Sequence, residues 1–207
     1  MTVQTLLMLP AVLLGLTRVG ITLHVAVDGG APVASEQWTE RIMKKTNELF
    51  EPAGCTFAIV RVTRFDDPGP EITRVSERHA LARHAEPDGT IHLFVVARLA
   101  DKERKGVWIA GVHWRYAGRK KAWRHRRYII LSQDAAGIDT PAHELGHYFG
   151  EGHARKPDNL MKRRPRDAGA RFSKQQIGRI KRRLAREIRR KALRPIENEP
   201  KKKQVER

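Results

Sequence analysis

Alternating apolar and polar residues mark the strands of this chain. The segments ITLHVAV (21–27) and TFAIVRV (56–62) alternate and are rich in β-branched residues, which is typical of half-buried strands. The run TIHLFVVARL (90–99) is almost continuously apolar and predicts a central strand. Two further strands are expected at GVWIAGVHWRY (106–116) and RRYIILS (126–132), joined by a very basic loop.

Apolar positions that recur every three to four residues predict helices between and after these strands. Ser35 is placed to cap the first helix, and a short helix is expected around Ile72–Arg83. The last helix begins with a capping box formed by Ser173 and Gln176. Its apolar positions form one narrow stripe: Ile177, Ile180, Leu184 and Ile188. This order of strands and helices predicts an α+β fold with a mixed sheet.

The length of 207 residues and the hydrophobic share of 40% are those of one globular domain. We assign residues 21–194 to this domain, residues 1–20 to an apolar leader and residues 195–207 to a basic tail without regular structure. The single cysteine, Cys55, excludes an internal disulfide framework. Packing, alone or with a bound metal ion, must therefore stabilise the fold, and a monomer is expected.

The leader leaves the location of the protein open. Its apolar stretch LLMLPAVLLGL (6–16) has the length of a secretory signal core and is too short to span a bilayer. No Lys or Arg precedes it, and the TRVG that follows is a poor cleavage site. The segment fits a signal peptide and a degenerate leader equally well. Its apolar stretch favours a secreted or periplasmic location, and the atypical flanks leave a cytoplasmic location open.

Positive charge is concentrated at the C-terminal end. The net charge is +18, and residues 162–207 contribute nineteen Lys and Arg against five Asp and Glu, a net of +14. Such a block can attract nucleic acid or anionic surfaces as a weak partner. The alternative is a solvated helix face that has no partner.

The segment HELGHYFGEGH (143–153) carries three of the nine histidines. On a helix, His143 and His147 lie one turn apart on the same face, close enough to hold one metal ion. If the helix continued, His153 would lie about 9 Å further along the axis than His147. A left-handed Gly150 can end the helix and bring His153 back towards the other two.

Three imidazoles with one open position are typical of a catalytic zinc site. The sequence therefore predicts one zinc ion held by His143, His147 and His153. Glu144 follows the first histidine by about 100° around the helix, so it flanks the metal without being forced to bind it. There it can act as the general base that takes a proton from metal-bound water.

The five positions of HExxHxxGxxH match the motif of the metzincins, and the sequence resembles this family of zinc endopeptidases. PDNLMKRR (157–164) resembles the methionine turn that follows the motif, with matrixin-like spacing, and implies that Met161 forms the floor of the site. The resemblance implies a twisted mixed sheet with packing helices, an active-site helix, the turn and a C-terminal helix. Ala154 and the absence of a Tyr two residues after Met161 leave the subfamily open.

In that family the substrate peptide lies antiparallel along an exposed edge strand. VWIAGVHW (107–114) is the candidate, although an interior strand fits the same pattern. The resemblance implies a zinc metalloendopeptidase that cleaves peptides or proteins by attack of metal-bound water. Two alternatives stay open: a protein that binds nucleic acid or anionic surfaces through its basic C-terminal block, and a zinc-stabilised scaffold without turnover.

Overall fold

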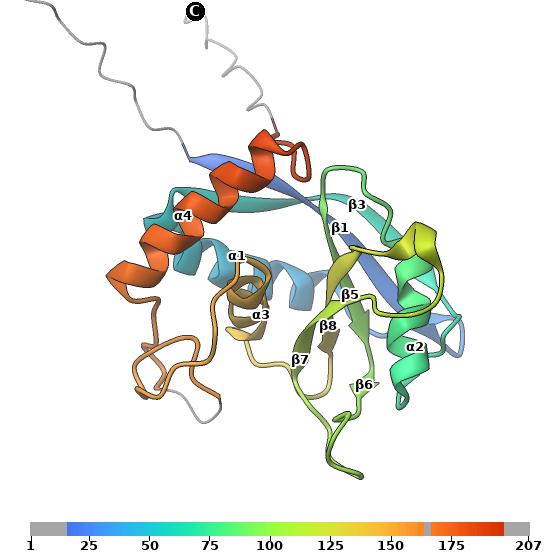
Figure 1. Cartoon of the computed structure of the whole chain (residues 1–207). Coiled ribbons are helices and arrows are strands. Elements are labelled where there is room, and N and C mark those ends of the chain that lie inside the picture. The colour runs from blue at the N-terminus through green and yellow to red at the C-terminus, as the bar shows by residue number, and fades with distance from the viewer. Residues whose placement is uncertain (1–15, 164–166, 197–207) are drawn as a thin grey trace, which may run out of the picture.

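The computed structural model describes residues 16–163 and 167–196 (Figure 1). In chain order its strands and helices are β1 (Thr17–Asp28), β2 (Ala31–Pro32), α1 (Glu36–Phe50), β3 (Cys55–Phe65), β4 (Glu71–Ile72), α2 (Val75–Ala80), β5 (Ile91–Val96), β6 (Arg98–Leu99), β7 (Gly111–Arg115), β8 (Arg127–Ser132), α3 (Thr140–Tyr148) and α4 (Lys174–Arg189). Short 3₁₀ helices lie at Glu51–Ala53, Leu81–His84 and Lys121–Trp123. No described helix is both long and apolar enough to cross a membrane.

The main sheet has the order β2-β1-β5-β8-β7. Strand β3 also pairs with β1, on the side of β1 opposite to β5. Strands β3, β1, β5 and β8 are parallel to one another, whereas β7 runs antiparallel to β8. The buried strand β5 lies between β1 and β8, as its continuous apolar run predicted. Strand β7 is the last of this order, so an edge strand directly precedes β8 and the helix α3.

Two predicted strands were too long. The strand predicted at 90–99 ends at Val96, because the Ala97 N–H donates to the Pro70 carbonyl and the chain leaves the main sheet. Arg98–Leu99 then pairs with β4 in a separate parallel ladder. Of the strand predicted at 106–116, only Gly111–Arg115 pairs with β8. In both cases the tertiary partner, not the apolar pattern, sets the boundary.

Both ends of the described chain join the same sheet. Strand β1 begins at Thr17 and not at residue 21, and residues 17–20 pair with residues 55–58 of β3. At the other end, Pro195 bridges to Val19 and the Ile196 N–H donates to the Arg18 carbonyl at 2.8 Å. The domain thus includes the last residues of the expected leader and the first of the expected tail. Residues 1–15 and 197–207, on which the rest of those two predictions falls, lie outside the described residues.

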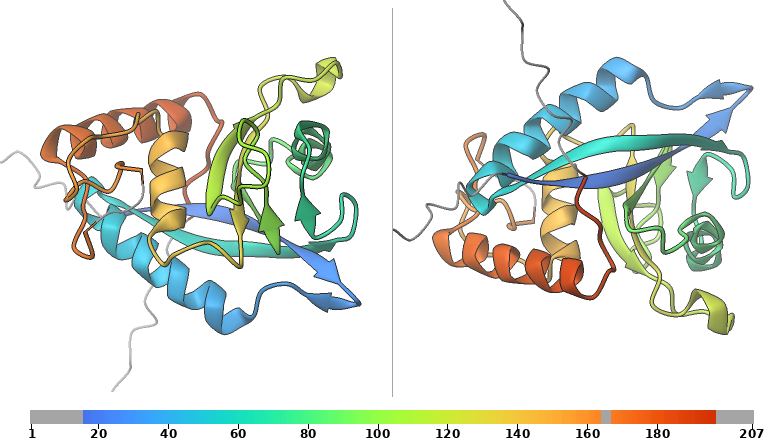
Figure 2. Two further views of the ribbon diagram at one scale, coloured as in Figure 1. Left: turned by 90° about the horizontal axis from the view of Figure 1, so that it is seen from below. Right: turned by 90° about the horizontal axis from the view of Figure 1, so that it is seen from above.

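Helices cover the sheet unequally (Figure 2). On one face α1, α3 and α4 pack together around a core in which the Phe50 ring lies 5.0 Å from the rings of Phe57 and Phe172. On the other face α2 packs over a smaller core around Phe94 and Tyr128. Helix α3 is therefore enclosed between the sheet, α1 and α4, and eight of its nine residues are buried. This enclosure fixes the helix that carries the histidine motif.

A pair of buried histidines joins β1 to β5 on the α2 face. His24 Nε2 lies 2.9 Å from His92 Nδ1, and His24 Nδ1 lies 2.6 Å from Thr63 Oγ1. Burial, followed by the charge of His92, lowers the pKa of His24 to about 3. Two imidazoles in contact in a low-dielectric interior cannot both carry a proton at moderate cost.

We expect acid to destabilise the fold through this pair. An unfolded chain protonates its histidines near pH 6.5, whereas the folded His24 does so only near 3. Between these values the unfolded state binds more protons, so the free energy of unfolding falls as the pH drops. Melting temperatures at about pH 7 and about pH 5 should therefore differ less in His24→Gln than in the unchanged protein. His125→Asn, which changes an exposed histidine, is the control and should behave like the unchanged protein. If the melting temperature of His24→Gln falls between the two pH values as much as that of the unchanged protein, the His24–His92 pair is not the cause of the acid sensitivity.

Candidate metal centre

Helix α3 brings the first two histidines of the motif together. It begins at Thr140 with Pro141 in its first turn, and Asp139 stands at the N-cap. Pro is suited to this place because its fixed φ is helical and its missing N–H would have no partner there. His143 Nε2 and His147 Nε2 lie 3.1 Å apart on the face of the helix that turns away from the core.

The left-handed glycine predicted after the helix is present. Gly150 has φ +91°, and its N–H donates to the His147 carbonyl while the N–H of Glu151 donates back to the Gly146 carbonyl. These bonds end the helix in a tight left-handed turn. The chain then returns so that His153 Nε2 lies 3.2 Å from His147 Nε2. One ligand atom from each of the three histidines thus lies within 4.8 Å of the others.

The hydrogen bonds of the imidazoles show that this cluster fits a cation. His143 Nδ1 lies 2.7 Å from the Leu160 carbonyl, and His147 Nδ1 lies 2.7 Å from the Glu151 carbonyl. Because a carbonyl only accepts, both Nδ1 atoms carry the proton and both Nε2 atoms present lone pairs. Lone pairs aimed at one another repel unless a metal ion lies between them. Tetrahedral zinc with Zn–N bonds of about 2.0–2.1 Å separates its nitrogens by about 3.3 Å, close to the spacing observed here.

The electrostatics of the cluster favour the neutral imidazoles that a metal requires. Burial is the largest cause that lowers the pKa of His147, and burial followed by the charge of His147 lowers the pKa of His153. His153 is the most exposed of the three, and its Nδ1 faces Arg163 Nε at 3.4 Å instead of a carbonyl. The third histidine is therefore held less firmly than the other two.

Beneath the histidines the chain makes the turn that was expected around Met161. Met161 is fully buried, and the carbonyl of its neighbour Leu160 is the acceptor that orients His143. Asn159 holds this turn in place: its Oδ1 accepts from the Met161 N–H at 2.9 Å, and its Nδ2 donates to Gln176 Oε1 at 2.9 Å. Gln176 belongs to the capping box of α4. The start of α4 is thus linked through Asn159 to the floor beneath the histidines.

Gly146 allows this floor to approach the helix. A Cβ built on Gly146 would collide with the Met161 sulfur and lie 3.1 Å from Phe172 Cε1. We therefore expect Gly146→Ala to destabilise the protein by roughly 1–3 kcal/mol through overpacking, measured by urea unfolding.

Gly178 of α4 is the matched control for this substitution. Its nearest neighbour would be the flexible Arg182 guanidinium at 3.6 Å. Gly178→Ala should therefore stabilise the helix by up to about 1 kcal/mol. Equal effects of the two substitutions would contradict the close packing at Met161.

Glu144 is buried between α3 and the edge strand β7. Its Oε2 accepts the backbone N–H of His113 at 2.8 Å. The strand can come this close because residue 111 is a glycine, whose added Cβ would lie 3.1 Å from Glu144 Cγ. This hydrogen bond fixes the orientation of the carboxylate.

Two ion pairs, each with a buried carboxylate, support the centre and were not predicted. Glu151, whose carbonyl orients His147, forms a bidentate pair with Arg179 of α4 at 2.9 and 2.6 Å. Arg127 of β8 donates to the Tyr148 carbonyl at the end of α3 and to Glu187 of α4 at 2.6 Å. These pairs connect α4 to both sides of the segment that carries the histidines.

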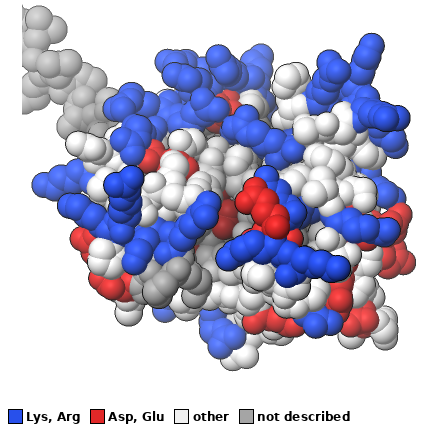
Figure 3. All heavy atoms as spheres, turned by 60° about the horizontal axis from the view of Figure 1, so that its bottom comes forward, with Lys and Arg blue, Asp and Glu red and all other residues white. Residues whose placement is uncertain are grey.

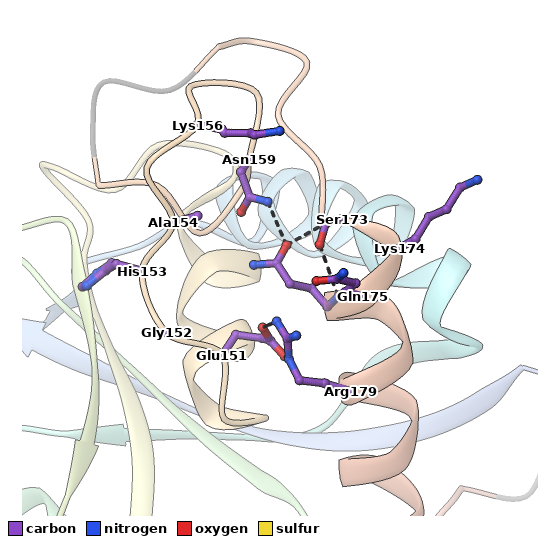
Figure 4. Close-up of a pocket in the computed structure, with 11 residues that line it drawn as sticks. Glu151, Gly152, His153, Ala154, Lys156, Asn159, Ser173, Lys174, Gln175 and Arg179 are labelled. Carbon is purple, nitrogen blue, oxygen red and sulfur yellow. Dashed lines mark hydrogen bonds and ion pairs between the residues drawn. The ribbon is translucent and has the colours of Figure 1, made fainter.

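A cavity of about 620 Å³ lies between this segment and the start of α4. Figure 4 shows residues that line it, among them Lys156, Lys174, Arg179 and His153. The imidazole of His153 points away from the cavity in this view. The space therefore adjoins the metal centre, and His153 belongs to both.

Comparison of the sequence with protein-family models and with curated proteins found no match. The fold, however, is similar to solved structures. Archaemetzincin from Methanopyrus kandleri has a TM-score of 0.53 at 16% identity, over 81% of this chain and 96% of that chain. Mirolysin in complex with compound 9 has a TM-score of 0.58 at 13% identity, over 86% and 96%. Metalloproteinase-II from Bacteroides fragilis has a TM-score of 0.56 at 12% identity, over 81% of this chain and 53% of that chain.

These neighbours are metzincin-type zinc proteases. The α+β, metzincin-like fold predicted from the motif and the order of elements is therefore confirmed. At these identities the similarity concerns the fold, and function has to be argued from the site itself.

Proposed function

We propose that this protein is a zinc-dependent endopeptidase. The observation that carries the proposal is the convergence of three imidazole Nε2 atoms, at 3.1 and 3.2 Å, beside a buried glutamate. His143, His147 and His153 would hold the ion. Zinc bound there supplies Lewis acidity, which lowers the pKa of a water molecule towards 7 and polarises the carbonyl under attack.

Glu144 is the proposed general base. Its carboxylate takes a proton from the attacking water, and the resulting carboxylic acid can return that proton to the leaving nitrogen. The His113 N–H holds Oε2 of Glu144 in place, so the carboxylate is oriented before the substrate arrives. Preorganised groups of this kind need no rearrangement during the reaction.

Strand β7 is the proposed binding edge for the substrate. Hydrogen bonds from the Tyr116 N–H to Arg126 and from the Ser132 N–H to Ala110 direct the even-numbered residues of the segment towards β8. The backbone groups of Gly111, His113 and Arg115 therefore face outwards, on the side where Glu144 lies. An extended peptide that adds to this edge would be held by main-chain bonds beside the general base.

Incubation with a mixed peptide library, with and without a metal chelator, tests the proposal. We expect internal peptide bonds to be cut only by the zinc-loaded protein. If the chelator lowers the melting temperature while no peptide is cut under any condition, the protein is a zinc-stabilised scaffold. Cleavage that persists after complete removal of zinc would also contradict the proposal.

The cleaved products should reveal a preference for acidic residues just after the cut bond. In the metzincin fold the segment after the third histidine borders that position, and here it carries exposed Arg155, Lys156 and Arg163. Lys and Arg predominate on the face shown in Figure 3. Positive side chains there favour Asp or Glu and disfavour Lys or Arg in the substrate. A profile with basic residues at this position would contradict the prediction.

A further inference from the structure

The three histidines of the metal centre differ in what faces their Nδ1 atoms. In His143 and in His147, Nδ1 lies 2.7 Å from a backbone carbonyl, which can only accept a hydrogen bond. In His153 the neighbour is a donor instead, because the Arg163 Nε–H donates to Nδ1 at 3.4 Å. His153 and Arg163 are both exposed. The proposed catalysis gives Arg163 no part in the metal centre.

This donor determines which nitrogen of the metal-free His153 carries the proton. A nitrogen that accepts a hydrogen bond presents a lone pair, so the neutral imidazole has its proton on Nε2. That Nε2 lies 3.2 Å from Nε2 of His147. His147 has its own proton on Nδ1, which faces the Glu151 carbonyl. Without metal, His153 therefore donates to His147. A chain of hydrogen bonds then runs from Arg163 through both imidazoles to the carbonyl.

Binding of zinc requires the opposite arrangement at His153. A ligand nitrogen must present a lone pair to the ion, so the proton has to leave Nε2 and move to Nδ1. Nδ1–H and the Arg163 N–H are then both donors, and two donors cannot bond to each other. The contact with Arg163 must break. A guanidinium beside a doubly charged cation adds electrostatic repulsion to this cost.

We propose that Arg163 sets the zinc affinity of the centre by holding His153 in the tautomer whose ligand nitrogen is protonated. Arg163 is thus a positioning residue that acts through one ligand. The ion is held less tightly than it would be by three imidazoles that each donate to an acceptor. This inference rests on the zinc site of the proposed function and not on peptide cleavage.

Titration of the metal-free protein with zinc, in competition with a chromophoric chelator, measures the effect. Arg163→Glu provides an acceptor for Nδ1–H and should raise the zinc affinity by roughly tenfold or more. Arg163→Lys should leave the affinity near that of the unchanged protein, because an ammonium group can donate to Nδ1 but cannot accept from it. Since Arg163 is exposed, the melting temperatures of the metal-free variants should be nearly unchanged.

Arg155→Glu is the matched control. Arg155 is exposed in the same segment, and its side chain forms no hydrogen bond or ion pair with any residue that the structure describes. The substitution changes the charge as much as Arg163→Glu does, but it provides no acceptor for His153. It should therefore raise the zinc affinity far less. Equal rises in the two variants would indicate a general effect of charge and would overturn the proposal.

Nitrogen NMR of the imidazole rings locates the protons directly. At about pH 8 the histidines of the metal-free protein are neutral. We expect the proton of His153 on Nε2, and those of His143 and His147 on Nδ1. In Arg163→Glu the proton of His153 should lie on Nδ1. A proton on Nδ1 of His153 in the unchanged, metal-free protein would contradict the proposed role of Arg163.

Two further results separate this inference from the proposed function. If the unchanged protein binds zinc and Arg163→Glu binds it with the same affinity, only the role of Arg163 is overturned. If the unchanged protein binds no zinc, the proposed function is overturned together with it.

Discussion

Replacing Glu144 by Gln is expected to lower the turnover of peptide hydrolysis by about two to four powers of ten, the usual contribution of a placed general base. The amide is nearly isosteric, and its oxygen can still accept the His113 N–H that now binds Oε2. Because the amide cannot take a proton from water at neutral pH, the loss should appear in kcat far more than in KM. Zinc content and melting temperature should be nearly unchanged.

Glu187 supplies a matched control for this experiment. It is also a buried carboxylate, but it pairs with Arg127 and Arg183 behind α3 and does not contact the histidines. Glu187→Gln should lower the melting temperature, since it leaves two partly buried guanidinium groups without their counter-ion, while zinc is retained. Loss of zinc from Glu144→Gln would instead make Glu144 a ligand, and full activity of that variant would assign the base to another residue.

The elements predicted correctly from the sequence are those specified by neighbouring residues. The capping box of Ser173 and Gln176 is present as predicted, and Ile180 and Leu184 of the expected stripe are buried. Gly150 adopts the left-handed conformation that the spacing of the histidines required. In each case the signal lies within about two helical turns, where backbone geometry alone fixes which residues meet.

The features that the sequence analysis missed depend on residues far apart in the chain. Glu151 and Arg179 are separated by 28 positions, and Arg127 and Glu187 by 60. No local pattern specifies which charges meet across such distances. One signal was available for Glu187, because it falls three residues after Leu184 on the apolar stripe. An acid on a buried face needs a partner, and a basic one was to be expected.

Strand lengths were overestimated for a related reason. An apolar run shows that residues are buried, but the ladder partner decides where pairing stops. Leu99 is as fully buried as Leu93, yet it belongs to the small sheet with β4. Gly111 marks the point where β7 meets Glu144, and a close approach of this kind is a common reason for glycine in a strand.

Replacing His153 by Ala is expected to remove zinc while leaving the fold of the apo protein intact. His153 is exposed, and beyond its neighbours in sequence its side chain contacts His147, His143 and Arg163. Its loss therefore costs little packing, and any loss of metal can be assigned to the missing ligand.

With His153 removed, only two of the three protein ligands of the zinc ion remain. Loss of a residue that merely hydrogen-bonds to a ligand lowers metal affinity by roughly 10–100-fold, and we expect the loss of a ligand to lower it by more. Elemental analysis measures the zinc, and thermal unfolding gives a second measure. A bound ion stabilises only the folded state, so a chelator should lower the melting temperature of the unchanged protein but not that of His153→Ala. His125→Asn, which changes an exposed histidine outside the cluster, should keep both the zinc and the response to the chelator. Full zinc content in His153→Ala would show that this histidine is not a ligand and would leave His143 and His147 in need of a different third partner.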